Sequence, residues 1–269
     1  MMRNYPAEHM WGTTREEEKK SEILEAGAEE VIIFNGHEPE AELKELLRKA
    51  ENILISIGPD ENGDRILAHH KDDLVENENL RWLGYLSTVG VYGNHDGAWV
   101  DETSETNPGS ERSSWRKKAE DQWLELYETR SLPVHIFRLP GIYGKGRGPV
   151  SKIKSGTARR IHKEGQVFNR AHVEDIAAAL EASCQNPNPG RVYNIADDEP
   201  APPQDVLAYA AELIGVETPP LIEFEDADFS PMAKSFYNDN KRVSNKRMKE
   251  ELGVKLKYPT YREGIKASI

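Results

Sequence analysis

The chain has 269 residues, of which 37% are hydrophobic, so it can bury one large core or two modest ones. Its 47 acidic and 35 basic side chains leave a formal net charge of −12, which argues against general binding of nucleic acid or of an anionic membrane. The single cysteine, Cys184, excludes an internal disulfide and a zinc site built from cysteines.

Targeting and membrane signals are missing from the hydrophobicity pattern. No window approaches the ~20 apolar residues of a membrane span, and the first residues lack the apolar region of a signal peptide. We therefore expect a cytoplasmic protein. We expect no metal site, because the adjacent His69 and His70 point apart on a predicted helix.

Short apolar runs alternate with charged amphipathic stretches, as in βα units around a parallel sheet. The expected strands are His9–Trp11, Val31–Phe34, Ile53–Ile57, Trp82–Ser87, Val134–Leu139 and Val192–Ile195. The expected helices are Glu16–Ala26, Glu40–Ala50, Ile66–His70 with its continuation, Arg116–Thr129, a helix from Val173, Pro203–Gly215 and Asn245–Leu252. The strands are almost wholly apolar, which predicts an α/β fold with helices on both faces of the sheet.

Two hydroxyl residues, Ser87 and Thr88, follow the strand at Trp82 and stand where open α/β sheets bind ligands. Ordinary capping hydroxyls at a strand end are the alternative. The surrounding run S-T-x-x-V-Y-G, followed by Arg112, Arg116 and Ala119-Glu120, closely resembles the active-site segment of extended short-chain dehydrogenases and nucleotide-sugar epimerases.

Three later segments extend this resemblance to the extended and atypical short-chain dehydrogenase/reductase superfamily, which includes NAD-dependent epimerase/dehydratase-like proteins. They are Arg138–Gly144 (R-x-x-x-x-Y-G), Asn169–Ala177 (N-R-A-H-V-E-D-I-A, which resembles the superfamily's R-x-x-H-V-x-D-h-A) and Val192–Ala196 (Y-N-h-A). The resemblance implies a Rossmann-like, doubly wound parallel sheet with a smaller C-terminal substrate lobe. It assigns 1–144 to an incomplete NAD(P)-binding domain completed by a returning strand near 191–197. It assigns 145–190 and 198–269 to the lobe.

The catalytic Tyr-x-x-x-Lys pair of this superfamily is replaced. Its two places are Arg112 and Arg116, and an arginine stays protonated and cannot act as a general base. Thr88 can still hydrogen-bond a substrate carbonyl or hydroxyl. Tyr92, His95 and Tyr143 are spare candidates for proton transfer, each with a structural role as the alternative. The two arginines either bind a phosphate or carboxylate or belong to a solvated helix start.

The glycine-rich strand–turn–helix with which this superfamily begins does not occur in the chain. The segment His9–Arg15 resembles the second strand and its turn, so the alignment starts roughly 20–30 residues late. The absent strand would lie at the centre of the sheet, between the second and fourth strands. Unpaired strand edges cost ~1–3 kcal/mol for each unsatisfied group. We expect a truncated chain; repair by residues 1–8 and a partner chain is the alternative.

The remaining cofactor positions can still be placed. Thr13, Thr14 and Arg15 follow the second strand, where an arginine would accept the 2′-phosphate of NADP. This favours NADP over NAD, with binding impaired in this chain; a solvated charge at a helix start is the alternative. The other expected cofactor contacts are Ser56, Gly58, Ser87 and Pro140. The expected substrate contacts are Tyr143, Arg170, His172 and Arg242.

The resemblance implies an NAD(P)-dependent oxidoreductase, or a nucleotide-sugar epimerase- or dehydratase-like protein, of unassigned substrate. That substrate would be a small molecule, phosphorylated or nucleotide-linked, and the protein would be a homodimer. The replaced Tyr-x-x-x-Lys pair favours an alternative, a catalytically silent dinucleotide-binding or regulatory protein of the same fold. A nonfunctional fragment is the third possibility.

Overall fold

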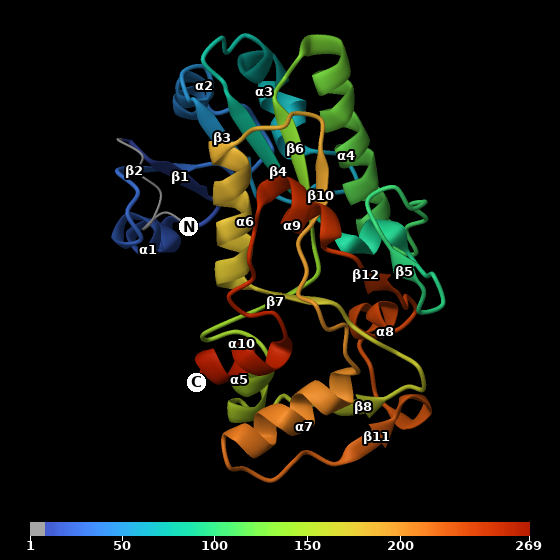
Figure 1. Cartoon of the computed structure of the whole chain (residues 1–269). Helices are drawn as coiled ribbons and strands as arrows, with labels where there is room; N and C mark the ends of the chain where they lie inside the picture. The colour runs from blue at the N-terminus through green and yellow to red at the C-terminus, as the bar shows by residue number, and fades with distance from the viewer. Residues whose placement is uncertain (1–8) are drawn as a thin grey trace.

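A four-stranded parallel sheet is the centre of the molecule. The computed structural model describes residues 9–269. The strands lie in the order β10-β6-β4-β3, and all neighbours are parallel (Figure 1). Their bounds are β3 Asn52–Ile55, β4 Trp82–Thr88, β6 Val134–Leu139 and β10 Val192–Asn194. This arrangement confirms the expected α/β class, with strand bounds within two residues of the prediction.

Helices cover both faces of this sheet. One face packs against α2 (Ala41–Leu47), α3 (Arg65–Val75) and α4 (Glu111–Arg130) in a core that contains Trp123 and Leu74. The other face packs against α6 (Val173–Gln185) and α9 (Lys246–Leu252). Figure 1 shows α6 in front of the strands. The sequence placed 173–185 in the smaller lobe; its buried apolar face, however, joins the core of the sheet domain.

Helix α4 begins five residues before the predicted start at Arg116. Ser110 is its N-cap, and the Ser110 hydroxyl oxygen accepts a hydrogen bond from the Ser113 amide. The first turn, Glu111 to Ser114, carries no apolar side chain, so hydrophobic periodicity could not detect it. Residues 112 to 116 therefore all lie on one helix.

The first two strands form a separate sheet. β1 (Trp11–Thr14) pairs in parallel with β2 (Glu30–Ile33), and α1 (Lys20–Glu25), preceded by a 3-10 turn at Glu17–Lys19, connects them. Within residues 9–269 no strand ladder joins β1 to β3. The sheet is interrupted between β1 and β3, where the sequence placed the missing strand.

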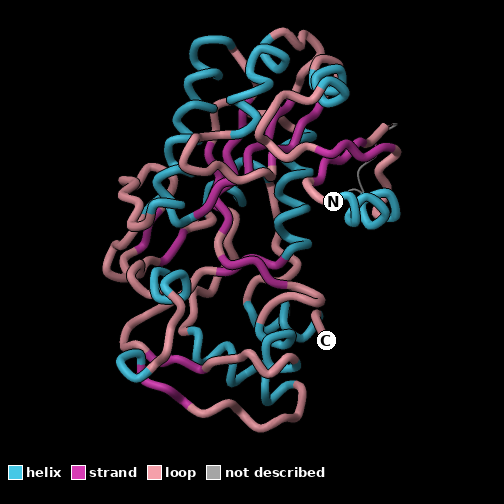
Figure 2. Tube along the Cα trace, turned by 180° about the vertical axis from the view of Figure 1, so that it is seen from behind, coloured by secondary structure: helices cyan, strands magenta, loops and turns pink. Residues whose placement is uncertain are grey.

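A smaller lobe lies below the sheet in Figure 1 and is seen from behind in Figure 2. Its core joins side chains of α5 (Pro149–Lys154), α7 (Pro203–Leu213) and α10 (Tyr261–Ala267). Three two-stranded parallel pairs border it. They are β8 (Arg160–His162) with β11 (Leu221–Glu223), β7 (Gly141–Tyr143) with β9 (Arg170–His172), and β5 (Trp99–Val100) with β12 (Arg242–Val243). The short helix α8 spans Pro231–Phe236.

Candidate functional site

The carboxyl ends of β3, β4 and β6 bring together several predicted residues. Thr88 ends β4, Ser56 and Gly58 follow β3, and Pro140 follows β6. A 3-10 turn, Val89–Tyr92, begins at Thr88, and the Thr88 Oγ1 atom accepts a hydrogen bond from the Gly90 amide at 3.1 Å. The hydroxyl hydrogen of Thr88 takes no part in that bond. Half-buried Thr88 therefore keeps a donor at the edge where α/β sheets bind ligands.

Arg116 reaches this edge from α4. Its Nη1 atom donates a 2.6 Å hydrogen bond to the carbonyl oxygen of Leu86, and its guanidinium lies 5.6 Å from the centre of the Tyr85 ring. A Cβ placed on Gly58 would be 3.1 Å from the Arg116 Nη2 atom. The guanidinium therefore lies between the ends of β3 and β4.

Arg112 does not join Arg116. Its side chain is exposed, and its Nη1 atom lies 3.6 Å from the sulfur of Met232 on α8. Ser113 faces the site instead, because a Cβ placed on Gly90 would lie 2.7 Å from Ser113 Oγ and 3.3 Å from Thr88 Oγ1. Ser113 was not among the residues predicted from the sequence. Only the tertiary contact between α4 and the Val89–Tyr92 turn identifies it.

Beneath the site lies a buried ion pair between β6 and α4. Arg138 Nη2 donates to Glu120 Oε2 at 2.8 Å, and both side chains are almost fully buried. Ser87 Oγ and Arg138 Nη1 are buried nearby and have no hydrogen-bond partner among the described residues. Ser87 pairs with Arg138 in the strand register. These two groups lie in the interior, below the carboxyl ends of β4 and β6.

Tyr92 is part of the core. It is fully buried, its hydroxyl donates to Asn194 Oδ1 at 2.8 Å, and Arg138 packs over its ring. Burial raises the pKa of the Tyr92 phenol above its ordinary value. A phenol that is buried, bonded and harder to ionise cannot exchange protons with a ligand at the surface. This placement supports the structural alternative for Tyr92.

Tyr143 and His172 also lie in the interior. Both are almost fully buried, and their rings meet edge to face at 5.3 Å. Tyr143 donates to the carbonyl oxygen of Thr260, and His172 Nδ1 accepts from the Glu174 amide as the N-cap of α6. Burial lowers the pKa of His172, and the ring serves as the cap through its Nδ1 acceptor. We therefore assign these two predicted substrate contacts to lobe packing.

Half-buried Arg170 and buried Asp197 lie close together at the junction with the smaller lobe. Arg170 donates to the carbonyl oxygens of Phe168 and Ala201, and its own carbonyl oxygen accepts from the Asp197 amide. Asp197 Oδ1 accepts from the Glu199 amide, and Oδ2 has no partner among the described residues. Burial raises the pKa of the Asp197 carboxyl to about 8, despite the nearby Arg170 charge.

Arg242 belongs to a strap, residues 237–245, that connects the two lobes. Its guanidinium donates to the carbonyl oxygen of Gly97. The buried Lys241 donates to the carbonyl oxygen of Gly93 at 2.7 Å, directly after the Val89–Tyr92 turn. Asn169 bonds the backbone of the strap from the other side. The strap therefore fixes the loop that follows Thr88, and Arg242 contributes to that anchoring.

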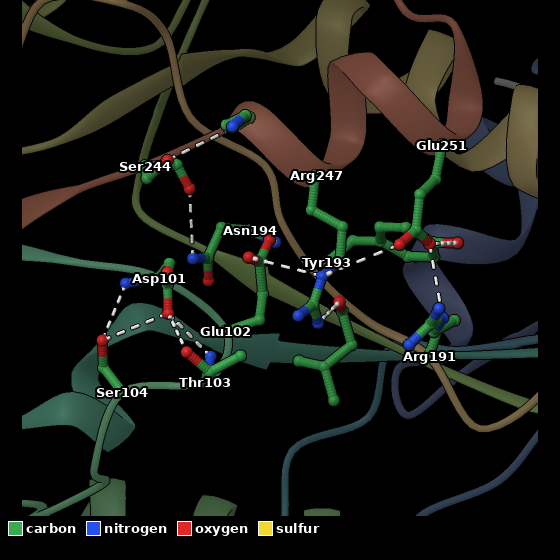
Figure 3. Close-up of polar contacts among 12 residues, drawn as sticks. Asp101, Glu102, Thr103, Ser104, Arg191, Tyr193, Asn194, Ser244, Arg247 and Glu251 are labelled. Carbon is green, nitrogen blue, oxygen red and sulfur yellow. Dashed lines mark hydrogen bonds and ion pairs between the residues drawn. The ribbon is translucent and has the colours of Figure 1, made fainter.

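The outer edge of β10 is closed by side chains that the sequence did not single out. Glu102 Oε1 accepts from the Asn194 amide at 2.8 Å, and Arg247 Nη1 donates to the Val192 carbonyl at 3.1 Å (Figure 3). Burial raises the pKa of Glu102. These contacts pair the backbone groups of an edge strand. The cluster is structural, at the opposite side of the sheet from the interruption.

Thr13, Thr14 and Arg15 lie beyond the interruption, at the end of β1. Thr14 Oγ1 accepts from the Glu16 amide at 3.2 Å, and Thr13 and Arg15 are exposed.

Among the helices within residues 9–269, none has the length and apolar character of a membrane span. In the same residues, no three His, Cys, Asp or Glu side chains gather as metal ligands. The hydrogen-bond donors of the candidate site lie at the carboxyl ends of β3, β4 and β6.

Comparisons with known proteins agree with this architecture. A sequence model of the NAD dependent epimerase/dehydratase family matches residues 72–196. Protein YeeZ of Escherichia coli strain K12 is 30% identical over 202 residues, which cover 73% of this chain and 67% of that protein.

The chain resembles many solved structures, including the following two. A functionally unknown conserved protein from Silicibacter pomeroyi matches with a TM-score of 0.89 and 52% identity, covering 97% of this chain and 89% of that one. The dTDP-glucose 4,6-dehydratase of Bacillus anthracis, solved in complex with NAD, matches with a TM-score of 0.76 and 19% identity. It covers 100% of this chain and 89% of that one, and it supports the fold alone.

Proposed function

Because the chain belongs to the NAD-dependent epimerase/dehydratase family of the short-chain dehydrogenase/reductase superfamily, we propose that it is a nicotinamide-dinucleotide-dependent oxidoreductase of the epimerase or dehydratase type. The observation that carries the proposal is that Thr88 and Ser113 meet at Gly90, and that Arg116 bonds the Leu86 carbonyl, all at the carboxyl end of β4. In open α/β sheets this edge is where ligands bind and react.

The residues at this edge fit one end of a dinucleotide. Gly58 leaves room beside Arg116 that a Cβ would fill, and Ser56, Pro140 and Thr88 end the neighbouring strands. Arg116, in the place of the family's lysine, would lie beside the bound dinucleotide. Exposed Arg15, after β1, supports NADP over NAD. The glycine-rich turn that would bind the pyrophosphate has no counterpart in the chain.

The cofactor, when bound, supplies hydride acceptance or donation. The Thr88 oxygen accepts a hydrogen bond from the Gly90 amide, and its hydroxyl hydrogen stays available. Thr88 would donate this hydrogen to the substrate oxygen at the reacting carbon. The described residues at the edge offer no ordinary general base, since the family's tyrosine and lysine places hold arginines. In this proposal solvent water would take the proton, and catalysis would depend on orientation and hydrogen bonding.

One observation favours a second function, a dinucleotide sensor without turnover. Arg116 Nη1 is already bonded to the Leu86 carbonyl, and Arg112 points away toward Met232. Neither arginine can replace a tyrosine that gives and takes a proton. Cofactor binding without any hydride exchange would support this second function.

Titration of the purified chain with NADPH and NADH tests the proposal. We expect the thermal midpoint to rise with NADPH concentration, because a ligand that binds only the folded state stabilises it by mass action. Thr88→Val should retain this shift and lose hydride transfer from candidate hydroxyl substrates by about 10-fold to 100-fold. Absence of a shift with either nucleotide contradicts the proposal. Unchanged hydride transfer in Thr88→Val contradicts the role of Thr88.

A further inference from the structure

Three side chains from two elements lie at the carboxyl end of β4. Thr88 Oγ1 and Ser113 Oγ both lie next to Gly90, within 3.3 Å of the position that a Cβ would take there. Arg116 follows Ser113 by three residues on α4, so the two share a helix face. The guanidinium of Arg116 rests on the carbonyl oxygen of Leu86, two residues before Thr88.

Each of these groups has a hydrogen-bond donor to spare. Ser113 Oγ accepts from the Ser110 hydroxyl, so its own hydrogen is not used in that bond. The Nε and Nη2 atoms of Arg116 make no hydrogen bond with any residue in the described part of the chain, whereas Nη1 makes two. All three residues are half-buried, so solvent or a ligand can reach them.

The charge of Arg116 is not neutralised by an ion pair with a described carboxylate. Asp64 is near enough to interact with it electrostatically, but both Asp64 oxygens are occupied. Oδ1 accepts from the Ile66 and Leu67 amides, and Oδ2 accepts from Trp123 Nε1 at 3.2 Å. In a chain with 47 acidic residues, a half-buried arginine without a paired acid favours an anionic ligand.

We propose that Ser113 and Arg116 bind an anionic group of the substrate, a carboxylate or a phosphate, beside the hydroxyl or carbonyl that Thr88 holds. The guanidinium supplies the charge and a fork of donors, and Ser113 supplies a third donor. The substrate class is therefore a hydroxy compound with an oxyanion close to its reacting carbon. The assignment rests on the proposed function, but the binding of the anion can be tested without any cofactor.

The experiment measures binding of inorganic phosphate and of malonate to the full chain by calorimetry, at constant ionic strength. We expect at least one of these anions to bind, and the stronger of the two identifies the substrate group. Arg116→Gln should weaken its affinity by about 10-fold or more, and Ser113→Ala by about 3-fold to 10-fold. Gly90→Ala should act like Ser113→Ala, because its methyl group would displace the Ser113 hydroxyl.

Matched controls come from the same helix. Lys118→Gln removes one exposed positive charge, and Ser114→Ala removes a hydroxyl that bonds only the Ser110 carbonyl; both should bind the anion like the unmodified chain. Thermal unfolding of each variant verifies that it is folded. The assignment is overturned if neither anion binds, or if Arg116→Gln binds it as tightly as Lys118→Gln does. A failed NADPH titration with intact anion binding would instead contradict only the proposed function.

Discussion

Glu120→Ala is expected to lower the free energy of unfolding by about 3–5 kcal/mol. The substitution leaves the Arg138 guanidinium buried between β6 and α4 without its carboxylate, while Arg138 Nη1 already has no partner among the described residues. A buried charge that loses its partner retains its full cost of desolvation. Urea denaturation followed by tryptophan fluorescence measures the change.

Two further variants make this result specific. Glu125→Ala changes an exposed glutamate on the same helix and should shift the free energy of unfolding by no more than about 0.5 kcal/mol. The double variant Glu120→Leu with Arg138→Met replaces the pair by apolar groups and should recover most of the loss. Equal stability of the Glu120 and Glu125 variants would show that the buried pair does not stabilise the fold.

Asp197→Asn is expected to change how stability depends on pH. The folded-state pKa of Asp197, about 8, lies above the ordinary value of 3.8 because the carboxyl is buried. The folded state therefore favours the protonated form of this carboxyl. The contribution of that form to the free energy of unfolding is lost as the pH rises from about 4 to about 8. The asparagine variant cannot ionise. Between about pH 5 and about pH 8, the free energy of unfolding of this variant should therefore rise by on the order of 4 kcal/mol relative to that of the unmodified chain.

Chemical denaturation at those two pH values tests this prediction. Asp205→Asn serves as the control, because Asp205 is exposed on α7 and should show a pH dependence like that of the unmodified chain. An Asp197→Asn curve parallel to that of the unmodified chain would mean that the carboxyl is ionised in the folded protein at neutral pH. Arg170 would then offset the burial of Asp197.

Local sequence predicted the sheet well because its strands are buried on both faces. Val134–Leu139 is wholly buried and matched its prediction without a shift. The run at His9 was displaced instead, and the strand begins at Trp11. Short pairs such as β5 with β12 escaped prediction, since two-residue strands have no periodicity and are defined by contacts distant in sequence.

The candidate site was predicted only where a backbone position determines the role. Thr88 follows a strand, so its place at the carboxyl edge could be inferred. Ser113 could not be inferred, because its role depends on how close α4 approaches Gly90. Tyr143 and His172 differ from Thr88, because both rings are buried. Their motifs mark residues that pack, and a motif alone does not separate a buried ring from one that faces a ligand.

The interruption between β1 and β3 affects how firmly the β1–β2 sheet is attached to the rest of the fold. Phe34 packs into the core shared with α2 and α3, and Lys49 lies over the ring of Trp11, so side-chain contacts attach the β1–β2 sheet to the rest. No strand ladder within residues 9–269 adds to them. We therefore expect the segment from β1 to β2 to open more readily than the four-stranded sheet. The residues proposed for the two ends of the dinucleotide would then differ in local stability.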